Sequence, residues 1–258
     1  MLRILALGDI VGTRTLEYLR TTLWTKRQEL GADFVVANGE NATEIHGVCS
    51  RDAALLLDCG VDLITLGNHT FGMRDLYDFL DNHPRDILRP ANFPAACPGC
   101  GDVVRDINGY RALCINVNGT VFMEPLDNPF SAVEAVLRRE EGRYDFALLD
   151  IHAEATSEKM ALARAFDGRV CVMFGTHTHV PTADERILPG GSGYITDLGM
   201  SGPDDGILGT KTEAVLTKMC RHMPAHFTVA EGEIVVNGAL FEVDPAAGRC
   251  VGVRRVRF

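Results

Sequence analysis

With 258 residues, 46% of them hydrophobic and 23% charged, the chain has enough apolar material for a substantial core, which excludes an intrinsically disordered protein. The formal net charge is −10, and lysine and arginine form no long cluster. Bulk binding to nucleic acid or to an anionic membrane is therefore disfavoured. The apolar runs are too short for a signal peptide or a membrane span, so we expect a cytoplasmic protein without a membrane partner.

The first part of the chain alternates between predicted strands and helices. A short apolar run, Ile4–Leu7, predicts the first strand, and leucines at helical spacing then predict a helix that stops at Gly31. Phe34–Ala37 predicts the second strand. A helix that Ser50 could cap follows, and Val61–Leu66 predicts the third strand.

The second part continues this alternation and then becomes rich in strands. Tyr110–Val117 and Phe146–Ile151 predict strands, and a capping-box sequence at Ser131 predicts the start of a helix between them. The remaining predicted elements are strands at Val170–Phe174 and Tyr194–Thr196, a helix at Glu213–Met223, and three strands within Phe227–Phe258 with a turn at Asn237-Gly238. This order predicts an α/β fold with a mixed sheet or two stacked sheets between helices. We expect one domain that spans residues 1–258.

Small groups of polar residues follow directly on predicted strands. They are Gly8-Asp9, Asn38-Gly39-Glu40-Asn41, Gly67-Asn68-His69, Asp150-Ile151-His152 and Gly175-Thr176-His177-Thr178-His179. In α/β sheets, ligands bind in the crevice beyond the carboxyl ends of the strands. If the strands are neighbours, the five groups converge on one place.

The residue types in these groups are suited to a pair of metal ions. His177 and His179 are separated by one residue, so in an extended segment both imidazoles would point to the same side. Histidine, carboxylate and amide ligands together favour iron, manganese or zinc over calcium. Asp9 and Glu40 neutralise only half the charge of two divalent ions, so the site would attract phosphate. Bound metal can also lower the pKa of a water to about 7.

Each group has a structural explanation when it is taken alone. The histidines at 177 and 179 could be exposed strand residues, and Asp9 could cap a turn. Asn41 and Asn68 could likewise be turn residues. The occurrence of such groups at five strand ends is what favours a metal site.

The segment Cys97-Pro98-Gly99-Cys100 could be a redox pair, half of a zinc site or an incidental loop. No two further ligands lie nearby at suitable spacing, and a thioredoxin-like motif would open a helix rather than stand among proline and glycine. An incidental loop is therefore favoured. Most of the other cysteines lie in apolar runs, which predicts reduced, buried thiols.

Two of the polar groups, Gly67-Asn68-His69 and Gly175-Thr176-His177-Thr178-His179, resemble the GNH and GHxH-type motifs of calcineurin-like metallophosphoesterases. Longer segments are similar to the YmdB-like branch of that superfamily, bacterial cyclic-nucleotide phosphodiesterases. These segments are residues 8–12, 37–42, 89–92, 152–159 and 183–191. The resemblance covers most of the chain to about Gly202. It implies an αββα sandwich, in which two stacked mixed β-sheets are flanked by helices.

The resemblance also implies a role for each polar residue. Metal one would be held by Asp9, Glu40, Asn41 and His179, and metal two by Glu40, Asn68, His152 and His177, with Glu40 as the bridge. His69 would protonate the leaving oxygen as general acid. Alternation along a strand would let Asn68 bind metal while His69 faces the substrate. The same alternation allows Glu40 and Asn41 to be ligands together only where the backbone turns sharply.

Two features depart from the wider superfamily. Its usual Asp-x-His is Asp9-Ile10-Val11 here, and its usual bridging aspartate is Glu40. Both changes fit the YmdB-like branch. Around the proposed ligands, Glu154, Thr176 and Asp184 are candidates for orienting the histidines. The histidines at 46, 83, 222 and 226 are interpreted as structural or surface residues.

The expected activity is hydrolysis of cyclic nucleotides (2′,3′-cyclic, 3′,5′-cyclic or both), with attack by a hydroxide that bridges two metal ions. Iron is the first expectation for the metal, with manganese and zinc as alternatives. A phosphomonoesterase or nucleotidase on the same site is one rival function. A nucleotide-responsive regulatory protein with little turnover is another. The resemblance also implies self-association into a homo-oligomer.

Overall fold

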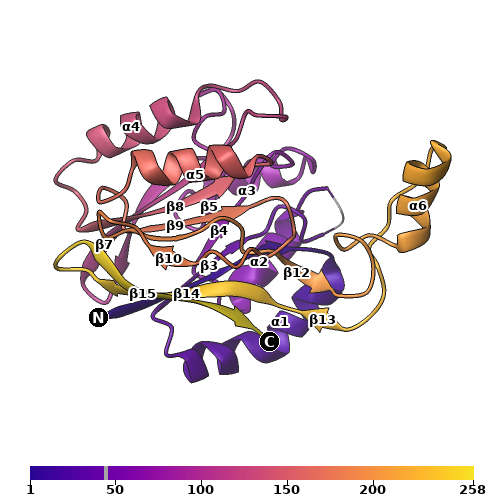
Figure 1. The fold of residues 1–258 in the computed structure, drawn as a ribbon, viewed down its shortest axis with the longest axis horizontal. Coiled ribbons are helices and arrows are strands. Elements are labelled where there is room, and N and C mark those ends of the chain that lie inside the picture. The colour runs from indigo at the N-terminus through magenta and orange to yellow at the C-terminus, as the bar shows by residue number, and fades with distance from the viewer. Residues whose placement is uncertain (44–45) are drawn as a thin grey trace.

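The computed structural model describes residues 1–43 and 46–258. Two six-stranded sheets are stacked on each other, and helices cover the outer face of each one (Figure 1). The predicted arrangement of two stacked mixed sheets flanked by helices is therefore confirmed. Within the described residues, no helix is both long and apolar enough to cross a membrane.

The first sheet has the strand order β15-β14-β1-β3-β4-β5. In that order the strands are Arg249–Arg257, Asn237–Asp244, Leu2–Leu7, Phe34–Asn38, Leu63–Thr65 and Ile87–Leu88. Strands β1, β3, β4 and β5 are parallel, and β14 and β15 add an antiparallel edge. The four parallel strands therefore deliver the residues that follow them to one edge of the sheet.

The second sheet has the order β10-β11-β9-β8-β7-β6. Its strands are Arg186–Ile187, Gly193–Ile195, Val172–Thr176, Phe146–His152, Tyr110–Asn118 and Asp102–Ile107. The central four strands are parallel, and both edge strands are antiparallel. A small third sheet joins β13 (Ile234–Val235), β12 (Met200–Pro203) and β2 (Asp9–Ile10).

Alternation along the strands separates the core into three layers. Along β1, Ile4 faces the second sheet, whereas Leu5 faces the helices on the outer side of the first sheet. The helices are α1 (Thr13–Leu30), α2 (Ser50–Asp58), α3 (Leu76–Asn82), α4 (Pro129–Arg139), α5 (Thr156–Ala165) and α6 (Thr212–Arg221). Helices α1 and α2 pack on the first sheet, and α4 and α5 pack on the second. Helix α6 projects from the body of the molecule (Figure 1).

The turn that the sequence predicted at Asn237-Gly238 is wrong. Asn237 and Gly238 do not form a turn but lie in β14, opposite Arg257 and Val256. The glycine is required there because a Cβ at 238 would lie 2.2 Å from the Ala6 carbonyl oxygen. The turn between β14 and β15 comes later, at residues 245–248.

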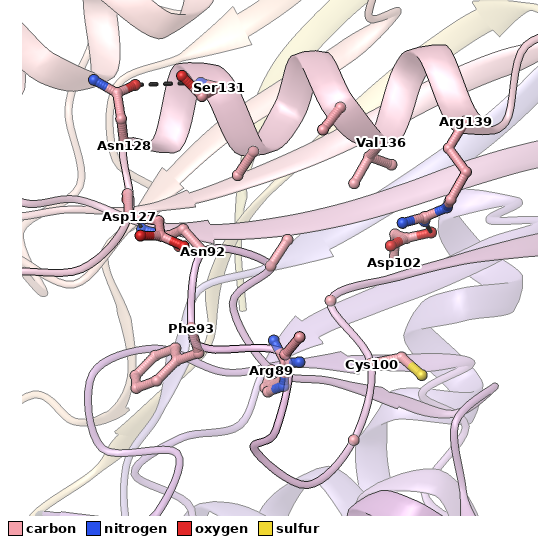
Figure 2. Close-up of a pocket in the computed structure, with 16 residues that line it drawn as sticks. Arg89, Asn92, Phe93, Cys100, Asp102, Asp127, Asn128, Ser131, Val136 and Arg139 are labelled. Atoms are coloured by element: carbon pink, nitrogen blue, oxygen red, sulfur yellow. Dashed lines mark hydrogen bonds and ion pairs between the residues drawn. The ribbon is translucent and has the colours of Figure 1, made fainter.

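Helix α4 also begins before the predicted capping box. Its N-cap is Asn128, whose side-chain oxygen accepts from the backbone N–H groups of Phe130 and Ser131 at 2.9 and 3.2 Å. Figure 2 shows the contact with Ser131. Pro129 follows as the first helical residue, where its fixed φ favours a helix and its missing N–H costs nothing. The Asn-Pro pair therefore starts the helix, and Ser131 lies within the first turn.

Candidate metal centre

Asp9 reaches the site because the chain turns immediately after β1. A Cβ at Gly8 would lie 1.7 Å from the Gly199 carbonyl oxygen, so only glycine allows β1 to be followed directly by β2. Asp9 is fully buried in β2, and its Oδ2 accepts from the backbone N–H of His177 at 3.0 Å. Burial raises the pKa of this carboxyl above its ordinary value, although the nearby histidines act in the opposite direction.

Glu40 and Asn41 lie in a turn that follows β3. The turn is closed by the N–H of Ala42, which donates to the Gly39 carbonyl at 3.1 Å. The backbone therefore turns sharply, as two adjacent ligands require, and both side chains approach the site histidines. Both residues are almost fully buried.

Asn68 and His69 do not alternate along a strand, contrary to the prediction. Strand β4 ends at Thr65, and a turn follows. The turn brings Asn68 Oδ1 to 3.0 Å from His152 Nε2. A Cβ at Gly67 would lie 2.1 Å from the His152 ring and 2.4 Å from Glu40 Oε2. The glycine therefore lets the main chain approach the centre closely.

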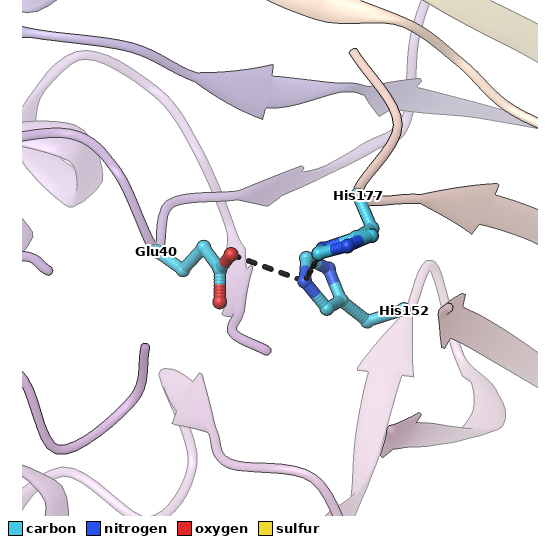
Figure 3. A group of neighbouring side chains, drawn as sticks. All are labelled: Glu40, His152 and His177. Atoms are coloured by element: carbon cyan, nitrogen blue, oxygen red, sulfur yellow. Dashed lines mark hydrogen bonds and ion pairs between the residues drawn. The ribbon is translucent and has the colours of Figure 1, made fainter. Parts of the chain in front are cut away.

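The first cluster of ligand atoms surrounds Nε2 of His152, the last residue of β8. Glu40 Oε1 lies 3.0 Å from this nitrogen, Asn68 Oδ1 lies 3.0 Å away and His177 Nδ1 lies 3.1 Å away. Figure 3 shows Glu40, His152 and His177 pointing toward one another. These are the four residues that were predicted for metal two.

The second cluster surrounds Nε2 of His179. Asp9 Oδ1 lies 3.8 Å from this nitrogen, and Asn41 Nδ2 lies 3.5 Å from it. Asn41 Nδ2 is also 3.5 Å from Glu40 Oε1, so the carboxylate of Glu40 lies between the two clusters. The residues predicted for metal one are thus brought together, and Glu40 contacts both sets.

The donor set fits cations. Asp9 Oδ1 and Asn41 Oδ1 are buried and have no hydrogen-bond partner among the described residues, which is costly unless something positive lies beside them. Burial alone would raise the pKa of Glu40, but His152 and His69 outweigh it and lower that pKa to about 2. Burial would likewise lower the pKa of His152, yet Glu40, Asp9 and Asp150 raise it to about 9. The carboxylates therefore stabilise positive charge at the centre of the site.

His177 and His179 are not held in an extended segment, as was predicted from their spacing. Strand β9 ends at Thr176, and the two histidines have φ angles of 97° and 65°. Such angles are uncommon for residues other than glycine and occur where the surrounding structure enforces them. Both imidazoles reach the site through this irregular loop rather than through strand alternation.

A buried ion pair holds the loop in this conformation. Asp197 Oδ2 accepts from the N–H and hydroxyl of Thr178 at 3.2 and 2.7 Å, and from Lys159 Nζ at 2.6 Å. Lys159 and Asp197 are both fully buried. Neither residue was given a role from the sequence, although Asp197 directly follows the strand predicted at Tyr194–Thr196 and Lys159 lies in the segment 152–159.

Two of the three predicted orienting residues contact the site histidines. The hydroxyl of Thr176 donates to Asp150 Oδ1 at 2.8 Å, so its oxygen accepts from His152 Nδ1 at 2.9 Å. His152 Nε2 is therefore the nitrogen that faces the cluster. Glu154 Oε2 lies 3.1 Å from His177 Nε2. The prediction for Asp184 is wrong, since it binds Thr182 and Thr196 instead.

His69 stands at the edge of the first cluster, next to Asn68. Its backbone N–H donates to Glu40 Oε2 at 3.1 Å, and its ring Nε2 lies 3.1 Å from Nδ1 of His46. Burial lowers the pKa of His69, and Glu40 acts in the opposite direction. His46 had been interpreted as structural or surface, and its sequence setting gave no signal of this contact.

A cavity of about 830 Å³ lies elsewhere, between α4, Asp102 at the start of β6 and the loop that contains Cys100 (Figure 2). Its lining includes Arg89, Asn92 and Cys100 but none of the predicted metal ligands. All eight cysteines are described and are free thiols, and four of them (Cys59, Cys114, Cys171 and Cys250) are buried. The expectation of reduced, buried thiols is met for these four.

Comparison with known proteins gives consistent matches over the whole chain. The model of the YmdB-like protein family matches residues 5–256. A 2′,3′-cyclic-nucleotide 2′-phosphodiesterase from Bacillus subtilis is 40% identical over 99% of this chain and 96% of its own length. The resemblance to the YmdB-like branch is therefore confirmed.

Two solved structures match at similar coverage. A hypothetical protein from Thermus thermophilus has a TM-score of 0.93 and 38% identity, covering 100% of this chain and 99% of that protein. A phosphatase from Mycoplasma pneumoniae has a TM-score of 0.92 and 34% identity, covering 100% of this chain and 93% of that protein.

Proposed function

The chain belongs to the YmdB-like protein family, and we propose that it is a metal-dependent phosphodiesterase that hydrolyses cyclic nucleotides at the described centre. Its broad class is a phosphoric ester hydrolase. Beyond that class we propose two metal ions per chain and 2′,3′-cyclic nucleotides as the first substrate, with 3′,5′-cyclic nucleotides as a second. The B. subtilis relative supports the 2′,3′ class by its name.

The observation that carries this proposal is the pair of clusters that share Glu40. Seven side chains from distant parts of the chain present oxygen or nitrogen atoms to one another within the distances given above, and two buried oxygens among them have no other described partner. Such an arrangement supports cations between the donors, because buried carboxylate and amide oxygens are costly without a partner. Asp9, Glu40, Asn41 and His179 would hold one ion, and Glu40, Asn68, His152 and His177 the other.

The chain's own residues complete the chemistry. Bound ions would supply positive charge for the phosphate and lower the pKa of a water. His69, beside Asn68 and outside the proposed ligand sets, would protonate the oxygen that leaves phosphorus. Thr176 and Glu154 would keep His152 and His177 oriented.

Three finer points belong to the same proposal. Iron is the metal that we propose first. Manganese and zinc are alternatives, because histidine, carboxylate and amide ligands suit all three metals. A cytoplasmic location and a single domain over residues 1–258 are further parts of it. Self-association into a homo-oligomer is also proposed, on the family resemblance alone.

The first test is metal analysis of protein purified without chelators, combined with a screen of cyclic nucleotides. We expect two metal ions per chain and continuous turnover of at least one 2′,3′-cyclic nucleotide. The Asp9→Ala and Glu40→Ala variants should lose metal, and Glu40→Ala should affect both ions because Glu40 contacts both clusters. Full metal occupancy in Glu40→Ala would refute the bridging role.

A phosphomonoesterase or nucleotidase is the nearest rival, and the M. pneumoniae phosphatase gives it some support. Rates on bis-p-nitrophenyl phosphate and p-nitrophenyl phosphate separate the two, since a diesterase prefers the first. A regulatory protein with little turnover is the rival from another class. For such a protein, we expect the amount of product to equal the amount of protein and not to increase over many catalytic cycles.

A further inference from the structure

A second cavity, of about 730 Å³, is lined by His46, whose ring contacts His69 at the edge of the candidate metal centre. Its walls come from two distant parts of the chain. They consist of Thr13, Thr43, His46 and Arg51 on one side, and of residues 225–229, which follow α6, on the other. We refer to it as the His46 cavity.

Each wall of the His46 cavity is connected by contacts to residues of the metal centre or next to it. Nδ1 of His46 lies 3.1 Å from Nε2 of His69, and the two ring centroids are 4.3 Å apart. On the other wall, Val229 packs so closely on Gly12 that a Cβ at 12 would lie 2.9 Å from its side chain. Gly12 in turn donates its N–H to the carbonyl of Asn41 at 2.9 Å. The cavity is therefore linked to the proposed acid through His46, and to the main chain of Asn41 through Val229 and Gly12.

The chemistry of a cyclic nucleotide predicts where its base lies relative to His69, the proposed general acid. In a 2′,3′-cyclic nucleotide the 2′ oxygen is bonded to the ribose carbon next to the one that carries the base. A general acid that protonates this oxygen must lie within hydrogen-bond distance of it. The base therefore lies a few bonds beyond His69. The His46 cavity is the one whose lining contacts the His69 ring, through His46.

The lining of the cavity suits a base. Phe227 and the imidazoles of His46 and His226 offer ring faces, and Thr43 and Arg51 offer polar groups. Stacking on aromatic side chains binds bases with little regard to sequence, and pockets for small ligands measure about 300–1,000 Å³. The volume and the lining both fall within this description.

The wall that carries Phe227 is fixed in place. The N–H of Lys211 donates to the Thr228 carbonyl at 3.0 Å, and the N–H of Ala230 donates to the Gly209 carbonyl at 2.7 Å. Nζ of Lys218, from α6, lies 4.9 Å from the centroid of the Phe227 ring. The segment that contains α6 therefore holds an aromatic ring in the wall of the His46 cavity.

We propose that the His46 cavity binds the base of the nucleotide substrate and that Phe227 is its stacking surface. This inference rests on the proposed function. A smaller cavity, of about 420 Å³, borders His179 instead. It is lined by a proposed metal ligand and not by His46, the residue that contacts the proposed acid. Its lining of Met200, Pro181, Arg255 and similar residues offers no aromatic ring apart from His179.

The test compares a substrate with and without a base. Steady-state kinetics are measured with 2′,3′-cyclic AMP and with the methyl riboside 2′,3′-cyclic phosphate, which lacks the base. In Phe227→Ala we expect the KM for 2′,3′-cyclic AMP to rise about tenfold, equivalent to about 1.4 kcal/mol, at an unchanged kcat. Both constants for the methyl riboside should stay within about twofold of the wild type.

The matched control is Phe122→Ala, since Phe122 is 90% exposed and does not line the cavity. We expect no base-dependent change in this variant. The proposal is overturned if Phe227→Ala affects both substrates equally, if it affects neither, or if the base-dependent loss appears in Phe122→Ala instead.

Failure of the proposed function is recognised separately. If the wild type turns over neither substrate, calorimetric binding of adenosine 3′-monophosphate and of inorganic phosphate to metal-loaded protein decides the case. The cavity proposal then requires Phe227→Ala to bind the nucleotide about tenfold more weakly and phosphate equally well. No nucleotide binding by the wild type, or equal affinity in the variant, overturns it.

Discussion

At the scale of single residues, the described centre separates side chains that would hold metal from the one that would transfer a proton. His69 contacts Glu40 only through its backbone N–H, so its ring is not needed to complete either cluster. We expect His69→Ala to retain its metal content and to lose about 10²–10⁴-fold in kcat, the usual contribution of a general acid. Elemental analysis and kinetics on the same preparation provide the measurement. An unchanged kcat would remove His69 from the mechanism.

His46 provides the matched control for His69. It lies 3.1 Å from the His69 ring but outside the clusters. His46→Ala should retain metal and keep most of its kcat, because the second imidazole does not reach the leaving oxygen in the proposed arrangement. A loss as large as that in His69→Ala would assign the proton transfer to the pair rather than to His69.

The buried pair of Lys159 and Asp197 allows a prediction about stability. Lys159→Met leaves the Asp197 carboxylate buried without its cation, and breaking a buried pair in this way costs about 3–5 kcal/mol. Urea unfolding of the metal-free protein measures the loss. The control is Lys211→Met, because the side chains of Lys211 and Glu231 are 43% and 80% exposed. Such a pair contributes about 1 kcal/mol or less, so equal effects of the two substitutions would contradict the role of the buried pair.

At the scale of elements, the sequence predicted long, strongly apolar segments well and short ones poorly. The strand at Phe146–Ile151 was placed within one residue, because it is buried along its whole length. Strands β2, β5 and β10 have two residues each, which is too short for any periodic pattern. Helix α5 was missed because it begins inside the polar segment that follows His152. The two-residue strands are specified by tertiary contacts rather than by a local sequence pattern.

The start of helix α4 gives a prediction that distinguishes the two proposed caps. Asn128→Ala removes the side-chain oxygen that accepts from two backbone N–H groups, and losing an N-cap costs about 1 kcal/mol. Ser131→Ala should change the free energy of unfolding by less than about 0.5 kcal/mol, as expected for surface substitutions. Urea unfolding of both variants provides the measurement. A larger loss of unfolding free energy in Ser131→Ala than in Asn128→Ala would support the capping box that was predicted from the sequence.

At the scale of the whole molecule, the sequence predicted which polar residues lie together because the fold delivers strand ends to one edge of each sheet. Asp9, Glu40 and Asn68 follow strands of the first sheet, whereas His152 ends β8 and His177 follows β9 in the second. The sequence could not predict the left-handed backbone of the loop that carries His177, nor the cavity wall that follows α6. Both depend on contacts between segments that are far apart in the chain, such as the one between Asp197 and Thr178.

The three-layered core also predicts how stability depends on pH. Burial raises the pKa of Cys114 from 9.0 to about 12, and those of Cys59 and Cys250 to about 11. The unfolded chain therefore loses these protons at lower pH than the folded chain does. The stability that the neutral thiols contribute is fully present below pH 9.0, and it is lost progressively as the pH rises from there toward the pKa values of the folded state.

Under reducing conditions, we accordingly expect the free energy of unfolding to fall as the pH rises above about 9. Urea unfolding between about pH 7.5 and 10.5 measures the slope. Cys114→Ala is the comparison: it should be less stable at every pH because it leaves a cavity. It should also show a shallower decline above about pH 9, because one raised thiol pKa is gone. Parallel curves for the two proteins would mean that the Cys114 thiol ionises alike in the folded and unfolded chain, contrary to its burial between the stacked sheets.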